Sequence, residues 1–270
     1  MSKKVKLTLI VFLLSIGFVF AGAEWTLKTV TTSTKKHGPN STIIAKVFTD
    51  GVNIRQQFVE IKSKNSKESP YEGEDVYWLY RGKEDVIYVV NTKDKTYTAV
   101  SLDTMLQMTR AIGKIVKFEI KDYNIKKTIL PDEVVNGFKC KHVKLYITYK
   151  MKMKIAFIKK TVNVEEEKEL WGSKDFKYFK NMESAFIKKN FKTGFEELDD
   201  AIQQEVNITK DLGFPIKTIE VSIDRDKKGK IKGKTITTTE LLNVKVKNFS
   251  KSFFEIPKDY QLMERENTPF

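Results

Sequence analysis

The sequence predicts a mainly β protein of the α+β class. Runs rich in β-branched and aromatic residues recur along the chain and are separated by short turns. The links between the first runs are too short for parallel crossovers, so these strands are expected to be antiparallel. Only a few stretches show the apolar spacing of a helix. With 18 phenylalanines in 270 residues, the chain has enough apolar surface to form a core.

The first half of the chain reads as a meander. The sequence Asp50-Gly51 favours a two-residue hairpin turn between the first two strands. Short polar segments at 81–83 and 91–94 separate the strands that follow. The predicted strands are residues 42–49, 52–62, 75–81, 86–90 and 96–100.

The next element changes period. Apolar residues spaced three and four apart, including Met105 and Met108, predict a helix over residues 102–117. Strand patterning returns at 120–130 and is expected to end at Pro131, which cannot donate a backbone hydrogen bond.

Residues 143–164 are predicted to be the longest β stretch, continued by residues 165–170. In its middle, Tyr149, Met151 and Met153 alternate with lysines, which indicates one apolar and one basic face. The acidic run 165–167 is interpreted as a solvated end of the strand.

Helical spacing returns in residues 176–191, where an aromatic stripe predicts a packing face. A second set of helical turns begins at Phe195, and acidic residues in its first turn suit the helix dipole. Two strands, 216–223 and 230–246, and a short segment, 253–256, are expected to follow.

The N-terminus reads as a secretory signal peptide. Lysines precede the apolar run of residues 7–20, and Ala21 and Ala23 provide the small residues of a peptidase site. Cleavage is expected after Ala23. The predicted organisation is a signal peptide at 1–23, a single β domain at 24–263 and a tail at 264–270, which predicts a periplasmic or extracellular protein.

The composition argues against several functions. The two histidines and the single cysteine, Cys140, show no spacing typical of a catalytic or metal site, so we expect no enzymatic activity, metal or cofactor. Cys140 is interpreted as a buried strand residue. The net charge of +14 favours an anionic membrane or envelope surface as partner, whereas export makes nucleic acid an unexpected one.

Several segments together resemble the superfamily of the periplasmic lipoprotein carriers LolA and LolB, and within it uncharacterised exported proteins that resemble outer-membrane lipoprotein-sorting proteins. These segments are YWLYRGK (77–83), VIYVVN (86–91), NGFKCKH (136–142), ELW (169–171), GFPIK (213–217) and FFEIPKDY (253–260). The resemblance implies an open, curved antiparallel sheet, like half a barrel, with helices packed on its concave face. It also implies that lipid acyl chains are held between sheet and helices.

Two functions from different classes follow. The first is a non-enzymatic carrier that binds a lipid or a lipid-modified protein in a dry cavity. The second is a structural or interaction protein of the cell envelope, with a filled core and a basic docking surface. For the carrier, the expected ligand-binding residues are Trp78, Tyr80, Met105, Met108, Met151, Met153, Phe176, Phe179, Phe186 and Phe191.

Overall fold

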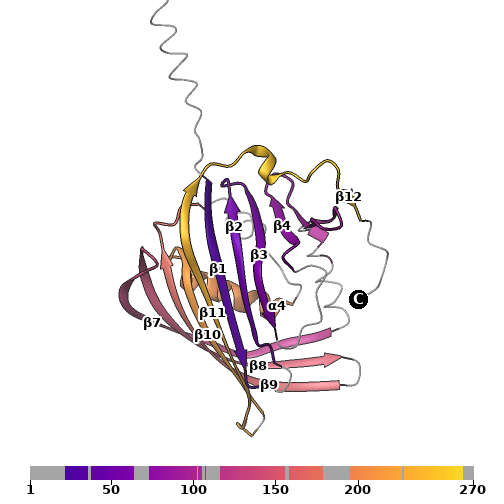
Figure 1. The fold of residues 1–270 in the computed structure, drawn as a ribbon. Helices are drawn as coiled ribbons and strands as arrows, with labels where there is room; N and C mark the ends of the chain where they lie inside the picture. Colours follow the sequence, from indigo (N-terminus) through magenta and orange to yellow (C-terminus); the bar gives the residue numbers. More distant parts are fainter. Residues whose placement is uncertain are drawn as a thin grey trace, which may run out of the picture.

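One curved sheet organises the part of the chain that the computed structural model describes (Figure 1). The strand order is β12-β6-β5-β4-β3-β2-β1-β11-β10-β9-β8-β7, and neighbouring strands are antiparallel except β12, which pairs with β6 in parallel. The described residues are 22–35, 38–63, 73–101, 103–104, 107, 116–155, 158–178, 195–226 and 228–263. The expectation of a mainly β fold with an open, curved sheet is therefore confirmed.

The elements follow the chain in this order. The first six strands are β1 (Gly22–Ser33), β2 (Ser41–Thr49), β3 (Asn53–Ser63), β4 (Val76–Arg81), β5 (Val86–Asn91) and β6 (Thr96–Ser101). The others are β7 (Val116–Val135), β8 (Phe138–Ile155), β9 (Ile158–Ser173), α4 (Glu196–Thr209), β10 (Phe214–Arg225), β11 (Ile231–Lys247), the 3-10 helix η1 (Lys251–Phe254) and β12 (Gln261–Leu262).

The predicted meander is confirmed in β2 to β6, where each strand pairs with the next. Gly51, in the turn between β2 and β3, has φ +88°, a conformation that glycine adopts without steric cost. The central strand β1 pairs with both β2 and β11 and so connects the meander β2 to β6 with the strands from the second half of the chain. Its first residues, Gly22 and Ala23, belong to the segment predicted as the peptidase site.

Strand β7 corrects two predictions. Val116 and Lys117, expected at the end of a helix, are the first residues of the strand. Of that predicted helix, Asp103, Thr104 and Gln107 are helical, and the other residues before Val116 lie outside the described part. The strand also runs through Pro131, because β7 is an edge strand and its pairing shifts register between Leu130 and Glu133.

The predicted single stretch 143–164 is wrong. It contains most of β8 and the start of β9, which pair as an antiparallel hairpin from Ile155↔Ile158 to Lys141↔Gly172. The pattern did not reveal the turn because the sequence between the strands, Ala156-Phe157, contains no glycine, proline or other residue typical of a turn.

Helix α4 confirms the helical pattern that begins after Phe195, including acidic residues in its first turn. Ile208 near its end and Leu212 beyond it pack against Val143, Leu145 and Ile147 of β8. The other helix expected on the sheet, 176–191, is not formed at Phe176, and residues 179–191 lie outside the described part. The expectation that helices pack on the concave face therefore stays a prediction.

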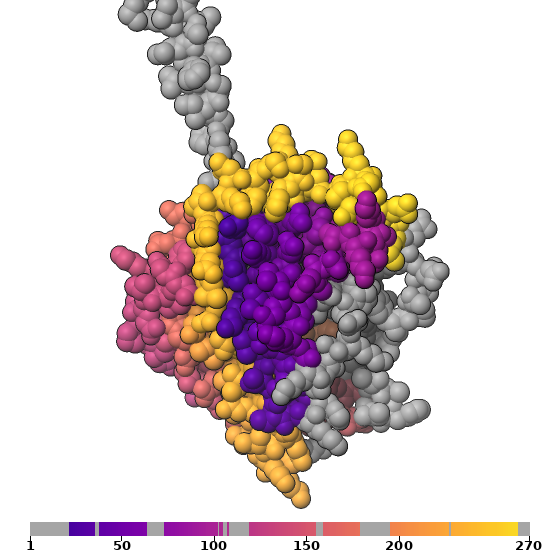
Figure 2. All heavy atoms as spheres, viewed as in Figure 1, coloured from indigo at the N-terminus to yellow at the C-terminus, as the bar shows by residue number. Residues whose placement is uncertain are grey.

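The C-terminal segment covers the strands near the start of the chain. Phe254 in η1 is buried with Phe48, Tyr77 and Leu79, and the first two residues of the predicted short segment, 253–254, belong to this 3-10 helix. Figure 2 shows this segment, in yellow, lying over the upper ends of the indigo and purple strands. The sheet thus carries packed side chains on both of its faces.

Candidate functional site

The strand register decides which side chains share a face of the sheet. Two residues that pair directly across neighbouring strands point to the same side, and residues two apart in one strand do as well. One face can therefore be followed across the sheet from Trp78. Each step goes either to the paired residue on the next strand or to the residue two positions along the same strand. The steps lead through Gln56, Val47, Trp25, Leu27, Leu241, Thr239, Thr218, Leu170 and Val143. Alternate positions of β8 then continue to Met151 and Met153. We call this side the Trp78 face and the opposite side the Trp171 face.

Four of the predicted ligand-binding residues lie on the Trp78 face. Trp78 and Tyr80 come from β4, and Met151 and Met153 come from β8, which lies seven strands further along the sheet. The structure therefore places two separate predicted groups on one surface. Met105, Met108, Phe179, Phe186 and Phe191 lie outside the described residues.

Phe176, the fifth described candidate, is a core residue. Its ring stacks on Phe214 with 4.4 Å between ring centroids and packs edge-on against Trp25 at 5.4 Å. Only 5% of its surface is exposed. It joins the ends of β1, β8 and β10 and lies in a segment without helical structure, so the predicted helix does not begin here.

The two ends of the Trp78 face are apolar. Near β4, the rings of Trp78 and Phe58 meet edge-on with centroids 6.3 Å apart. Tyr80 is buried and donates a hydrogen bond from its hydroxyl group to Asp85 at 2.9 Å. Burial, together with that carboxylate, raises the pKa of Tyr80 to about 12. Near β8, Met151 and Met153 are half-buried beside the buried Val162.

The middle of the Trp78 face is polar, and the expected dry cavity between sheet and helices stays a prediction. Hydroxyl groups meet across β1 and β11: the pairs Thr29–Thr239 and Thr31–Thr237 are 3.4 Å apart, and Ser33–Thr235 are 3.2 Å apart. These side chains are half-buried. The face therefore changes from apolar to polar and back to apolar across the sheet.

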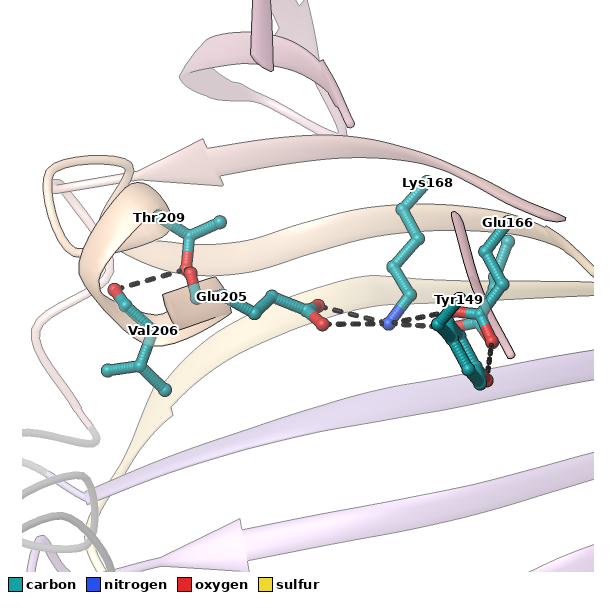
Figure 3. Close-up of polar contacts among 7 residues, drawn as sticks. Tyr149, Glu166, Lys168, Glu205, Val206 and Thr209 are labelled. Carbon is teal, nitrogen blue, oxygen red and sulfur yellow. Dashed lines mark hydrogen bonds and ion pairs between the residues drawn. The ribbon is translucent and has the colours of Figure 1, made fainter. Parts of the chain in front are cut away.

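A charged group, which we call the Lys168 cluster, lies on the same face. It consists of Tyr149, Glu166, Lys168, Glu205 and Glu220. The Lys168 ammonium group lies 3.0 Å from Glu205 of α4 and 3.7 Å from Glu166 (Figure 3). It also lies 3.7 Å from Glu220. Tyr149 donates a hydrogen bond to Glu166 at 2.7 Å. The cluster links β8, β9, β10 and α4.

Local structure explains why these charges meet. Ala201, Glu205 and Ile208 are spaced four and three apart in α4, so Glu205 lies on the stripe of the helix that packs on the sheet. In β9, Glu166 and Lys168 follow the buried Val162 and Val164 at alternate positions. From the sequence, the acidic run 165–167 was interpreted as solvated. The alternation that starts at the buried Val162 could have predicted that Glu166 points to the same side as Val162 and Val164.

Three carboxylates surround one ammonium group, and this imbalance acts together with burial on the pKa values of Lys168, Glu220 and Tyr149. Burial alone would lower the pKa of Lys168, but the charges of Glu205, Glu220 and Glu166 outweigh it and raise the pKa. Burial raises the pKa of Glu220, although Lys168 opposes the shift. Burial and the Glu166 carboxylate also raise the pKa of Tyr149. The cluster is thus suited to bind cationic or hydroxyl-bearing groups rather than anions.

The Trp171 face holds the histidine and cysteine considered in the sequence. His142 stacks on Trp171 with 4.1 Å between ring centroids, between Glu133 and Glu169. Cys140 is 2% exposed, which confirms the interpretation of a buried strand residue, and burial raises the pKa of its thiol. Within the described ranges, no three or more His, Cys, Asp or Glu side chains are grouped to hold a metal ion.

Comparisons with known proteins give a family and a likeness in structure. A LolA superfamily protein from Nitrosomonas europaea, known from a crystal structure, is 12% identical to this chain, with a TM-score of 0.31. The match covers 89% of this chain and 93% of that protein. A search of the curated proteins finds no match.

The family assignment comes from a separate comparison. The model of the family described as "Domain of unknown function (DUF4412)" matches residues 59–260. This match spans most of the chain, from within β3 to just before β12. No described helix is both long and apolar enough to cross a membrane. The chain belongs to the DUF4412 family.

Proposed function

We propose that the protein is a non-enzymatic carrier, exported to the periplasm, that binds a lipid or a lipid-modified protein on the Trp78 face. The observation that carries this proposal is the strand register, which brings Trp78, Tyr80, Met151 and Met153 to one side of a curved sheet. Methionine is flexible and suits a surface that accepts apolar partners of variable shape.

The polar groups on the same face support an amphiphilic ligand. An acyl chain can pack against the apolar ends of the face, while the threonine hydroxyls and the Lys168 cluster contact a polar head group. Because the cluster has more carboxylates than ammonium groups, it favours head groups that carry an amine or hydroxyl group. The ligand class is therefore an amphiphile rather than a plain hydrocarbon.

The three tryptophans of the chain allow a direct test. A phospholipid with brominated acyl chains and an amine-bearing ethanolamine head group quenches the fluorescence of a tryptophan that it contacts. We expect quenching in the wild-type protein and a clear loss of quenching in Trp78→Phe. The matched control is Trp171→Phe, which changes the same residue type on the opposite face of the sheet and should leave the quenching unchanged.

A second measurement separates the carrier from the envelope-interaction alternative. Protein purified without detergent should release a lipid on organic extraction, detected by mass spectrometry. Absence of both quenching and extracted lipid would contradict the carrier. Quenching lost equally in Trp78→Phe and Trp171→Phe would contradict binding on the Trp78 face.

A further inference from the structure

The end of the β8–β9 hairpin forms an open pocket of about 710 Å³ with a strongly basic wall. Glu119 is the single carboxylate among the described residues that line it. The lining residues are Glu119, Lys150, Lys152, Met153, Lys154, Lys159, Lys160, Thr161 and Asn163. Five lysines thus gather where the two strands end.

The strand register sets four of these lysines on one side. Lys150, Lys152 and Lys154 occupy alternate positions of β8 on the Trp171 face, and Lys159 pairs directly with Lys154. We call these four residues the lysine face. Like charges directly opposite each other in a sheet destabilise the pair. The fold therefore holds a repulsive arrangement that a bound polyanion would relieve.

Nearby carboxylates neutralise only part of this charge, although Glu119 of β7 pairs directly with Lys152 of β8. Asp122 lies 2.7 Å from Lys150, and Glu119 lies 3.3 Å from Lys121, which is outside the pocket wall. Lys152, Lys154 and Lys159 form no salt bridge with any residue in the described part of the chain. Two of these three, Lys154 and Lys159, are also exposed to solvent.

We propose that the lysine face docks the protein on the surface of an anionic lipid bilayer. The backbone positions of these lysines lie about 5 Å apart on neighbouring strands and about 7 Å apart at alternate positions of one strand, which forms a grid of separate positive side chains. Such a grid matches a layer of lipid phosphates better than one small anion. Lysines near an anionic membrane contribute independently to binding, so several together produce stable attachment.

This inference extends the carrier proposal but does not rest on it. Met151 and Met153 lie on the opposite face of the same strand segment. Docking through the lysine face would therefore leave these two methionines on the side of the hairpin that points away from the bilayer, where they remain open to a ligand. A protein with a filled core would dock in the same way, without accepting lipid.

The test uses vesicles of phosphatidylcholine alone, or with an equal part of phosphatidylglycerol, in a sedimentation assay. We expect binding to the anionic vesicles only, and loss of binding at high salt because screening shortens the range of the attraction. Combining Lys152→Gln, Lys154→Gln and Lys159→Gln should weaken the partition coefficient about a hundredfold, since each of the three lysines contributes roughly fivefold.

A matched control removes the same charge elsewhere. Combining Lys83→Gln, Lys93→Gln and Lys258→Gln neutralises three exposed lysines away from β8 and β9 and should leave binding nearly unchanged. Equal weakening by both triple variants would show that only net charge matters and would overturn the proposal. Equal binding to neutral vesicles, or tighter binding to duplex DNA at the same salt, would also overturn it.

A site-directed probe distinguishes docking from misfolding. With Cys140→Ser to remove the native thiol, Thr161→Cys places a polarity-sensitive fluorophore at the pocket wall, and Ala99→Cys places it on β6. Anionic vesicles should shift the emission at position 161 but not at 99. Equal shifts at both positions would contradict docking through this hairpin. Because quenching through Trp78 is read separately, failure of docking and failure of the carrier function can be told apart.

Discussion

Lys168 of β9 and Glu205 of α4 form an ion pair of 3.0 Å that ties the helix to the sheet. The side chain of Lys168 is 16% exposed and that of Glu205 30% exposed, so the pair is partly shielded from water. Both residues lie on the Trp78 face, where the sequence patterns indicated apolar packing.

Substitution of Lys168 should destabilise the protein. Lys168→Met leaves Glu166, Glu205 and Glu220 close together without their cation, and we expect a loss of about 2–4 kcal/mol in the free energy of unfolding. Urea unfolding measures it. The control is Lys144→Met, which breaks the more exposed pair with Glu167 and should cost about 1 kcal/mol or less. Equal costs would show that the cluster does not stabilise the fold.

Glu220 gives a prediction of pH dependence. Its folded-state pKa is raised above the ordinary value of 4.5, so its ionised form is disfavoured by folding. Below pH 4.5 Glu220 is protonated in both states and has no effect, and its cost appears as the pH rises through the folded pKa. Glu220→Gln should therefore be more stable than the wild type at pH 7 and equal to it near pH 4. A stability difference that grows toward acid pH would contradict the sign of this shift.

The C-terminal segment should stabilise the strands that it covers. Phe254 is 3% exposed and packs with Phe48, Leu79 and Val90. Phe254→Ala should cost about 3–5 kcal/mol, and limited proteolysis should then cut first within residues 249–263. Lys251→Ala, an exposed change in the same 3-10 helix, is the control and should be nearly neutral. Unchanged proteolysis in Phe254→Ala would show that the segment is not held by this ring.

Processing of the N-terminus can be read from the intact mass of exported protein. We expect cleavage after Ala23, which gives a mature chain that begins at Glu24. The mature protein would then lack two residues of β1: Gly22, which pairs with Lys247, and Ala23, which is fully buried. An intact mass that corresponds to a chain beginning at Gly22 would show that both residues of β1 are kept and that cleavage occurs after Ala21. A mass that includes residues 1–21 would contradict the signal peptide.

Much of the fold could be predicted because strand patterns are local. The strand patterns in residues 42–100 predicted the strands of the meander. The helical spacing after Phe195, with acidic residues in the first turn, predicted α4. The β8–β9 turn could not be predicted, since Ala156 and Phe157 lack turn chemistry. Of the candidate site, the aromatic and methionine residues were predicted. The Lys168 cluster was not, because its members come from residues 149 to 220 and meet only through pairing between strands.

The sequence by itself determined the alternation of each strand, and with it the apolar side of β4 and the opposed apolar and basic sides of β8. It also determined that the chain is rich in lysine and has a single cysteine. Only the tertiary structure decided that Trp78 and Met151 share one face, because the register of the strands between them is set by long-range pairing. The same pairing decided that Glu166 and Lys168 face α4, where their charges compensate each other in partial burial.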